Sequence, residues 1–195
     1  MNKYYITPLN DSIKCSELSY YFTNVSLLNA NNEWINLGNY DLIENNNPES
    51  KTIVLPNVPA GDYSSIRFMI GVDSIANSTG SHEGELSPAY GMYWSWATGY
   101  VFFRFKGRTS GNRSVSFDIG GNQNLPIAEI PLNSLKNSGK SITMNIAFNL
   151  AEIFVNPHNY SLDSNSIDIH TAIDPDVYKL RDNIAKGAFT ITTVQ

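Results

Sequence analysis

Apolar and polar residues alternate along much of this chain, and the alternation predicts β-strands. It is cleanest over residues 140–150, and it recurs over 66–71 and again after Gly99. Successive side chains of a strand point to opposite faces of a sheet, so the pattern is typical of strands with one buried face. The predicted core consists of Ile66, Phe68, Ile70, Val101, Phe103, Phe105, Ile142, Met144, Ile146 and Phe148. The side chains expected to face outward between them include Phe102, Arg104 and Lys106.

Shorter or less regular stretches predict further strands, which are separated by turns rich in Asn, Gly and Pro. These strands cover residues 4–6, 18–27, 34–37 and 52–55. The alternation slips near Asn24, where we expect a β-bulge. Residues 73–90 show little periodicity and predict a long loop, and loops of this length in compact domains are usually functional or disordered.

Helix signals are confined to the last third of the chain. Residues 149–155 are expected to form a short helix before Pro157. Asp174, Pro175 and Asp176 together form a helix start, with a capping carboxylate followed by Pro at the first helical position. That helix has an apolar stripe and ends at Gly187. Many short strands with late helices predict an all-β protein: a single β-sandwich domain over residues 1–195, with long loops and one or two short helices near the C-terminus.

The most aromatic segment lies between Gly91 and Gly99. On alternation, Met92, Trp94 and Trp96 share one face of a strand, and Tyr93 lies on the other with Ser95 and Ala97. This strand serves either the core or the wall of a binding site. We favour the core, because large aromatic side chains are mostly buried.

Composition excludes several classes of function. A net charge of −5 and a pI near 5.1 argue against nucleic-acid binding, which needs a basic face. No apolar run approaches the roughly 18 residues of a membrane span. The sequence has no Gly-x-Ser-x-Gly elbow and no Gly-rich phosphate loop, and we expect no enzymatic activity. Cys15 is the only cysteine, so an intrachain disulfide is impossible, and Lys14 before it is not the small residue of a lipidation site.

Several short motifs carry a resemblance to a known family. They are GVDS (71–74) with the following Asn77, GELSP (84–88), GMYWSWATGY (91–100), SYYFTNVSL (19–27), PAGDYSSIRF (59–68) and SFDIGG (116–121). In these motifs the chain resembles the MbnP-like domain family, which is named for a methanobactin-associated copper-binding protein of the bacterial envelope. The resemblance covers roughly residues 4–154, and GMYWSW followed by GY is its most specific part.

The resemblance implies an exported binding protein of the periplasm or the cell surface, with or without a lipoprotein anchor. Its expected partner is a copper ion or an envelope protein. Met1 is followed at once by polar and strand-like residues and not by a signal peptide. We therefore expect a signal, and a first strand of the sandwich, upstream of this sequence.

The copper site of the family is altered in this chain. In family members that bind copper, the site resembles two histidines joined by a tryptophan that has been oxidised to kynurenine. One histidine follows the motif's asparagine, where this chain has Ser78 after Asn77. The other lies in a Phe-His-x-Gly-like segment, where this chain has Asp118. The acidic residue usual before the glycine that closes the aromatic strand is replaced by Lys106.

Two readings of the site follow. In the first, the chain is a copper-binding or copper-handling domain with a rearranged metal site, in which His82 from the long loop joins Asp118 and Met92. In the second, it is a structural or ligand-binding module of the envelope that binds no metal. Hard oxygen donors in the same region make calcium a weaker alternative, and His158 and His170 are not expected to be ligands. The binding residues expected under either reading are Asp73, Asn77, Met92, Tyr93, Trp94 and Trp96.

Overall fold

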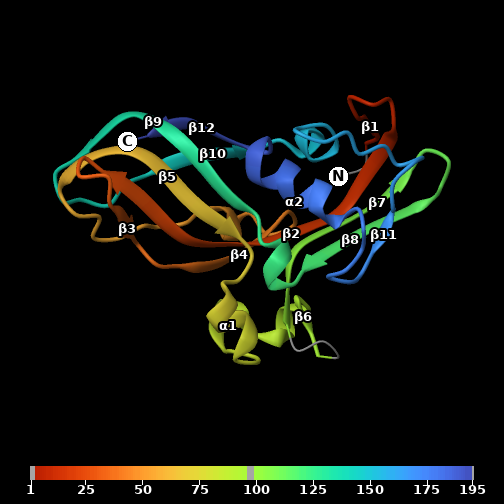
Figure 1. Ribbon diagram of the computed structural model, residues 1–195, viewed down its shortest axis with the longest axis horizontal. Coiled ribbons are helices and arrows are strands. Elements are labelled where there is room, and N and C mark those ends of the chain that lie inside the picture. The colour runs from red at the N-terminus through yellow and green to blue at the C-terminus, as the bar shows by residue number, and fades with distance from the viewer. Residues whose placement is uncertain (1–2, 96–98, 195) are drawn as a thin grey trace.

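One long strand organises the larger of two sheets. In the computed structural model, which describes residues 3–95 and 99–194, β2 (Ser12–Asn29) is 18 residues long and lies near the middle of that sheet (Figure 1). Its first half pairs antiparallel with β7 (Gly99–Thr109) and its second half with β5 (Gly61–Ile70). The sheet continues through β8 (Ser114–Gly120), β11 (Asp168–Ile169) and β9 (Ile127–Asn137), in the order β11-β8-β7-β2-β5-β9. The shorter strands β1 (Tyr5–Ile6), β3 (Trp34–Asn36) and β4 (Tyr40–Glu44) pair with β2, and β6 (Tyr93–Trp94) pairs with β7.

The expected bulge in β2 is confirmed. The pairing of β2 with β5 shifts register between Thr23 and Ser26, and Asn24 between them has a φ of 53°. Asn tolerates this left-handed conformation better than most residues. The bulge lies within the pairing of β2 with β5, a few residues after the pairing with β7 ends at Tyr20.

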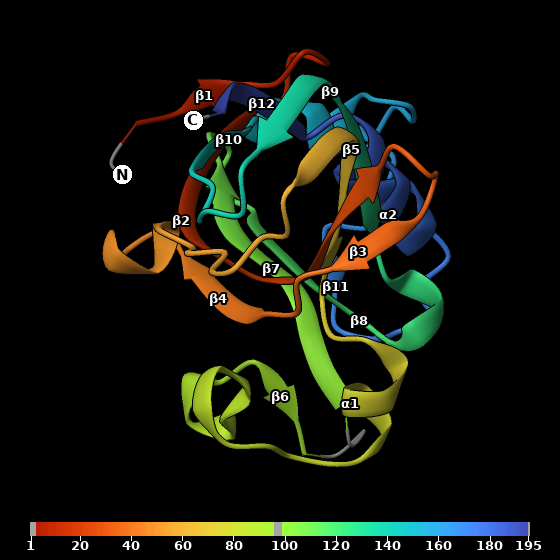
Figure 2. The same ribbon diagram turned by 90° about the vertical axis from the view of Figure 1, so that its left-hand side faces the viewer.

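A second sheet of β10 (Met144–Phe148) and β12 (Phe189–Val194) packs over the inner face of the large sheet and completes a β-sandwich. Figures 1 and 2 show β10, β12 and α2 (Val177–Lys186) on one side of the large sheet, with α1 (Ser74–Ser78) and β6 on the other. The 3-10 helix η5 (Leu150–Phe154) closes the same core as α2. No helix in the described part of the chain has the length and hydrophobicity to cross a membrane.

The predicted core is mostly confirmed. Ile66, Phe68, Ile70, Val101, Phe103, Phe105 and Ile142 are all buried. Met144, Ile146 and Phe148 of β10 face the core as expected, but they remain half-buried. Their neighbours Asn145 and Ala147 are exposed, so the assignment of faces along β10 is right.

The prediction that Phe102 faces solvent is wrong. Phe102 is fully buried in a second core on the outer face of the large sheet. Val101 is buried as expected, but it belongs to this second core and not to the main core with Phe103 and Phe105. The pairing of β7 with β8 shifts between Val101 and Phe103, and the segment 71–95 covers the outer face at this point. Alternation along one strand cannot reveal such a cover, because it arises from a distant part of the chain.

Local predictions elsewhere had mixed outcomes. The segment 73–90, expected to be a loop, contains α1 and the 3-10 helices η2 (Gly84–Leu86) and η3 (Pro88–Tyr90). The expected strand 52–55 is reduced to a single bridge from Leu55 to Ile142, and the 3-10 helix η1 (Glu49–Lys51) precedes it. The C-terminal helix begins at Val177, slightly later than the Asp-Pro-Asp signal predicts, and it ends before Gly187 as expected. The 3-10 helix η4 (Asn122–Asn124) was not predicted.

Candidate functional site

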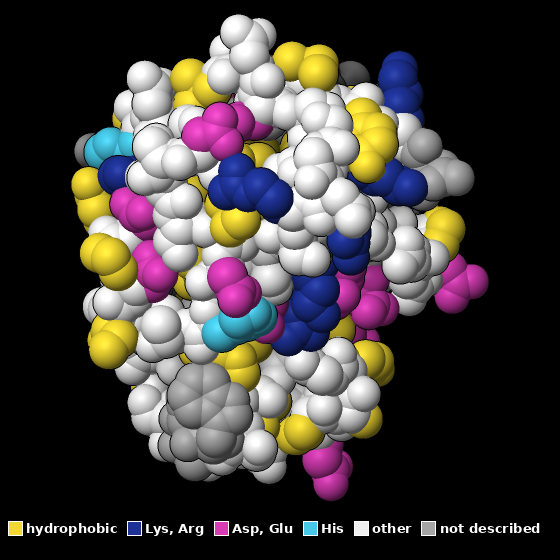
Figure 3. Space-filling view, turned by 90° about the vertical axis from the view of Figure 1, so that its right-hand side faces the viewer, with side chains coloured by type: hydrophobic (Ala, Val, Ile, Leu, Met, Phe, Trp, Pro, Cys, Tyr) yellow, Lys and Arg dark blue, Asp and Glu magenta, His cyan; other side chains and the backbone are white. Residues whose placement is uncertain are grey.

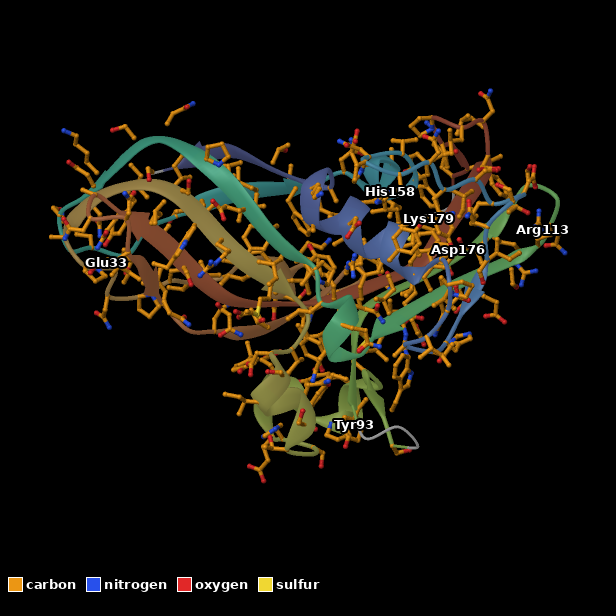
Figure 4. The ribbon with its side chains drawn as sticks, in the orientation of Figure 1. Glu33, Tyr93, Arg113, His158, Asp176 and Lys179 are labelled. Carbon is orange, nitrogen blue, oxygen red and sulfur yellow. The ribbon has the colours of Figure 1, made fainter. Side chains whose placement is uncertain are left out.

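Three of the motifs that resemble the family, at residues 71–74, 84–88 and 91–100, come together on the outer face of the large sheet. Residues 71–95, with α1, η2, η3 and β6, form a lobe that packs against β7, and we call it the aromatic lobe. Figure 2 shows it projecting from the sheet, and Figure 4 places Tyr93 within it. The core between lobe and sheet, called here the second core, contains Tyr21, Leu42, Val72, Leu86, Met92, Trp94, Tyr100, Val101 and Phe102.

Asp73 begins α1. Its carboxylate accepts hydrogen bonds from the backbone N–H groups of Ile75 at 3.0 Å and Ala76 at 3.2 Å, so it serves as the N-cap. The hydroxyl of Tyr40 also donates to it. Burial opposes the ionisation of Asp73, but the bonds from Tyr40 and Ala76 outweigh burial and lower the pKa of the carboxyl. These local bonds occupy the carboxylate as a helix cap.

Asn77 fastens α1 to the sheet. Its side chain is buried, its Oδ1 accepts from the backbone N–H of Tyr100 at 2.8 Å, and its Nδ2 donates to Oδ1 of Asn122 at 2.8 Å. The amide therefore links the lobe to both β7 and η4. Ser78, at the position of a family histidine, is exposed.

The aromatic strand packs into the second core. Met92 is 1% exposed and Trp94 is 9% exposed, which supports the core reading over a binding wall for these two side chains. The ring of Tyr93 lies edge-on to that of Tyr100, with 5.0 Å between the centroids. Trp94 lies against Gly120, where a Cβ atom would come within 2.8 Å of the indole ring. Trp96 lies outside the described residues.

Asp118 is held by an arginine. It lies opposite Arg104 in the register of β8 with β7, and its two carboxylate oxygens accept from Nε at 2.7 Å and Nη2 at 2.9 Å. The side chain of Asp118 is only 6% exposed, so the pair is largely shielded from water. The hydrogen bond to Asp118 is the main cause that raises the pKa of Arg104, which stays positively charged. Arg104 also donates to the carbonyl oxygen of Gly91 in the lobe.

Further ionisable side chains surround this pair. Nδ1 of His170 lies 3.4 Å from Asp118, and its Nε2 lies 2.7 Å from Asp168. On the other side, Glu17 contacts both Arg104 and Lys106. Figure 3 shows acidic, basic and histidine side chains lying side by side across this region of the surface. The site at Asp118 is therefore an extended ion-pair network.

His82 contacts a different set of residues. Its Nε2 lies 3.0 Å from the carbonyl oxygen of Ala76 and 3.0 Å from the hydroxyl of Thr79, and its backbone N–H donates to Tyr100. A carbonyl oxygen can only accept, so the bond to Ala76 requires the proton on Nε2. Nε2 then has no lone pair for a metal, and the lone pair of the neutral ring lies on Nδ1.

The predicted metal residues are therefore placed in separate environments. Asp118 is bonded to Arg104, His82 to the end of α1, and Met92 is buried in the second core. Among the described residues, no three His, Cys, Asp or Glu side chains are grouped so as to hold a metal ion. The only cysteine, Cys15, lies in the main core, where burial raises the pKa of its thiol.

Two residues at this site were missed from the sequence, Arg104 and His170. The signal for Arg104 was present, because a hairpin turning near Gly111 places it directly opposite Asp118. His170 follows the two-residue strand β11, which pairs parallel with β8, and such a short pairing leaves no readable pattern. Arg104 contributes a positive charge and two hydrogen bonds to Asp118, and His170 places a ring nitrogen 3.4 Å from the same carboxylate.

Comparison with known proteins agrees with this arrangement. The sequence model of the MbnP family matches residues 1–172. The solved structure titled MbnP from Methylosinus trichosporium is similar with a TM-score of 0.53, over 95% of this chain and 89% of that one, at 16% identity. A likeness at this identity establishes the fold alone. No curated protein sequence matches the chain.

Proposed function

The chain belongs to the MbnP family, and from this premise and the geometry at Asp118 we propose that it is an exported, non-catalytic binding domain whose copper site has become an ion-pair network. The family consists of binding proteins rather than enzymes. Export to the periplasm or cell surface is carried over from the family. The observation that carries the proposal is the guanidinium of Arg104 against both oxygens of Asp118.

The positive charge of Arg104 disfavours the binding of a metal cation at Asp118. Two like unit charges about 4 Å apart repel by about 4 kcal/mol at an effective dielectric constant near 20. A copper ion that bound to Asp118 would have to displace Arg104 or accept this repulsion. Asp118 is also a hard oxygen donor, whereas copper prefers imidazole and sulfur.

The remaining donors do not supply an alternative set. The hydroxyl of Ser78 is a poor copper ligand. His82 can offer only Nδ1, because Nε2 is directed to the carbonyl of Ala76, and among the described residues no group of three His, Cys, Asp or Glu side chains surrounds it. His170 is the imidazole nearest to Asp118, but both of its ring nitrogens face carboxylates, at 3.4 Å from Asp118 and 2.7 Å from Asp168, and Asp118 also holds the guanidinium of Arg104. The residues present do not fit a two-histidine copper site, and we expect weak copper binding.

Copper titration by competition with a chelator tests the proposal. We expect wild type, His82→Ala and His170→Ala to bind copper equally weakly, without saturation below the millimolar range. Sub-micromolar binding that either alanine variant abolishes would contradict the proposal and identify the ligand. As a positive counterpart, Ser78→His combined with Asp118→His and Arg104→Gln should raise the copper affinity, because it returns imidazoles to both positions and removes the cation.

The tryptophans provide a second test. Oxidation of a tryptophan to kynurenine changes its mass by about 4 Da, which peptide mapping resolves. We expect Trp94 and Trp96 to be unmodified in protein isolated from the native organism, because the ion-pair network leaves no copper site for a kynurenine to join. An oxidised residue at either position would show that the modification is independent of the two histidines.

A module that binds another ligand and no metal is the second candidate. The burial of Met92 and Trp94 favours this candidate, because buried side chains stabilise the lobe and are not exposed to bind a metal. Under this reading the family fold is retained as a scaffold. Complete absence of copper binding, even in the triple variant, would favour it.

A further inference from the structure

A cavity of about 320 Å³ lies between the two sheets, away from the aromatic lobe. Small-molecule sites in proteins have volumes of roughly 300–1,000 Å³ and mostly apolar walls. Here the walls come from β2, β4 and β5 on one side and from β10 and β12 on the other. They include Tyr20, Phe22, Ile43, Ile66, Ile146 and Phe148.

The cavity is open to solvent. Met144, Ile146 and Phe148 face it from β10 and remain half-buried, although they lie on the inner face of the strand. Inner faces of a sandwich normally interdigitate at the density of a protein interior. The inward-facing residues of β10 therefore border a hollow that a ligand can reach.

Three polar residues interrupt these apolar walls: Tyr20, Lys51 and Asn45, whose side-chain oxygen accepts from the backbone N–H of Leu18. Tyr20 is 9% exposed, and no residue in the described part of the chain hydrogen-bonds to its hydroxyl. Burial raises the pKa of Tyr20, so the hydroxyl keeps its proton and can donate. Lys51 is exposed at the cavity, with Nζ 3.2 Å from the carbonyl oxygen of Asn45. Within the described residues it forms no ion pair with a carboxylate.

We propose that this cavity binds one acyl chain that ends in a carboxylate. The chain would lie between the sheets against the aromatic and aliphatic walls, with its carboxylate at the ammonium of Lys51. The small volume favours a single chain over the paired chains of a phospholipid, so the proposed ligand is the free acid. This site is independent of the copper proposal, because it shares no residue with the network at Asp118.

Calorimetric titration of the full chain with dodecanoate, below its micelle concentration, tests the proposal. Decanoate should bind about fifteenfold more weakly, because each buried methylene contributes about fourfold to affinity. Dodecanol and dodecyltrimethylammonium have the same chain without the negative charge, and both should bind more weakly than dodecanoate. Equal binding of all three head groups would overturn the assignment of Lys51.

Paired variants locate the site. Ile146→Trp fills the cavity and should abolish binding, whereas Ala147→Trp on the exposed face of the same strand should leave it unchanged. If Ile146→Trp fails to fold, Met144→Phe narrows the same wall with a smaller change. Lys51→Glu should weaken dodecanoate binding about fivefold or more and spare dodecanol, and Lys140→Glu is the matched control.

Several results would reject the site. Dodecanoate binding unaffected by both Ile146→Trp and Met144→Phe would place the chain elsewhere. Binding to phosphatidylcholine vesicles without binding of dodecanoate would indicate a membrane surface and not a cavity. Copper affinity should be the same in Lys51→Glu and wild type, so failure here is distinguishable from failure at Asp118.

Discussion

Buried hydroxyl groups of this chain differ in whether they are paired. Tyr21 is fully buried in the second core, and no described residue hydrogen-bonds to its hydroxyl. Tyr160 is equally buried in the main core, and its hydroxyl donates to the carbonyl of Ser166. An unpaired buried polar group costs the free energy of its lost hydration, whereas a paired one contributes to stability.

This contrast predicts opposite outcomes for one substitution. Tyr21→Phe should leave the free energy of unfolding unchanged or raise it by about 1 kcal/mol, because it removes an unsatisfied group. Tyr160→Phe should lower it by about 1–2 kcal/mol through loss of its bond to the Ser166 carbonyl. Urea unfolding of both variants checks this. A loss above about 1 kcal/mol in Tyr21→Phe would reveal a bound water as partner.

Asn77 is the residue on which the attachment of α1 depends. Asn77→Ala leaves the backbone N–H of Tyr100 buried without its acceptor, and we expect a loss of about 1–3 kcal/mol in the free energy of unfolding. The adjacent exposed Ser78→Ala is the control and should change stability by less than about 0.5 kcal/mol. Equal effects of the two variants would mean that the amide is not essential. The result matters for function because the resemblance singled out Asn77 as a binding residue.

At the scale of elements, the start of α2 is held by a carboxylate. Asp176 accepts from Lys179 at 2.9 Å, from the backbone N–H of Ser166 at 2.9 Å and from Asn165 at 3.0 Å. Figure 4 shows Asp176 and Lys179 close together at this end of the helix. Burial opposes ionisation, but these bonds outweigh it, so the pKa of Asp176 lies below its ordinary value of 3.8.

The lowered pKa sets the direction of a pH effect. A carboxyl whose pKa is lower in the folded state contributes stability above its unfolded pKa and loses it as the pH falls through the folded one. Asp176→Asn should therefore lower the free energy of unfolding near neutral pH. As the pH falls below about 4, the variant should lose less of its remaining stability than wild type does. Asp62→Asn, at an exposed position of β5, is the control for a change of net charge. Parallel pH–stability curves for wild type and Asp176→Asn would contradict the assignment.

Elements with a strong local pattern were predictable, and those made by distant contacts were not. The alternation of β5 and β10, that of β7 from Phe103 onward, and the apolar stripe of α2 each identified a buried face from sequence alone. The lobe could not be predicted in this way, because its helix α1 is only five residues long. Asp73 caps the start of this helix, and Asn77 attaches it to β7. At the site, the sequence identified Asp118, but its partner Arg104 follows from strand pairing, and His170 comes from a distant segment.

At the scale of the whole molecule, one sheet separates two cores. The main core lies between the sheets, and the second core lies between the large sheet and the aromatic lobe. Phe103 belongs to the first and Met92 to the second, and both are buried. Regions attached through few contacts open with less free energy than the centre of a fold. We therefore expect the lobe to open as a unit while the sandwich stays intact.

Native-state hydrogen exchange of two variants tests this separation. Met92→Ala should lower protection of amides in the lobe and at Val101, whose N–H donates to the carbonyl of Met92 at 3.0 Å, and it should spare β9 and β10. Phe103→Ala should lower the global free energy of unfolding by about 3–5 kcal/mol and reduce protection throughout, because its cavity lies in the main core. A uniform loss of protection in Met92→Ala would show that the two cores fold as one cooperative unit. In that case the lobe could not be altered, for copper or any other ligand, without a cost to the whole sandwich.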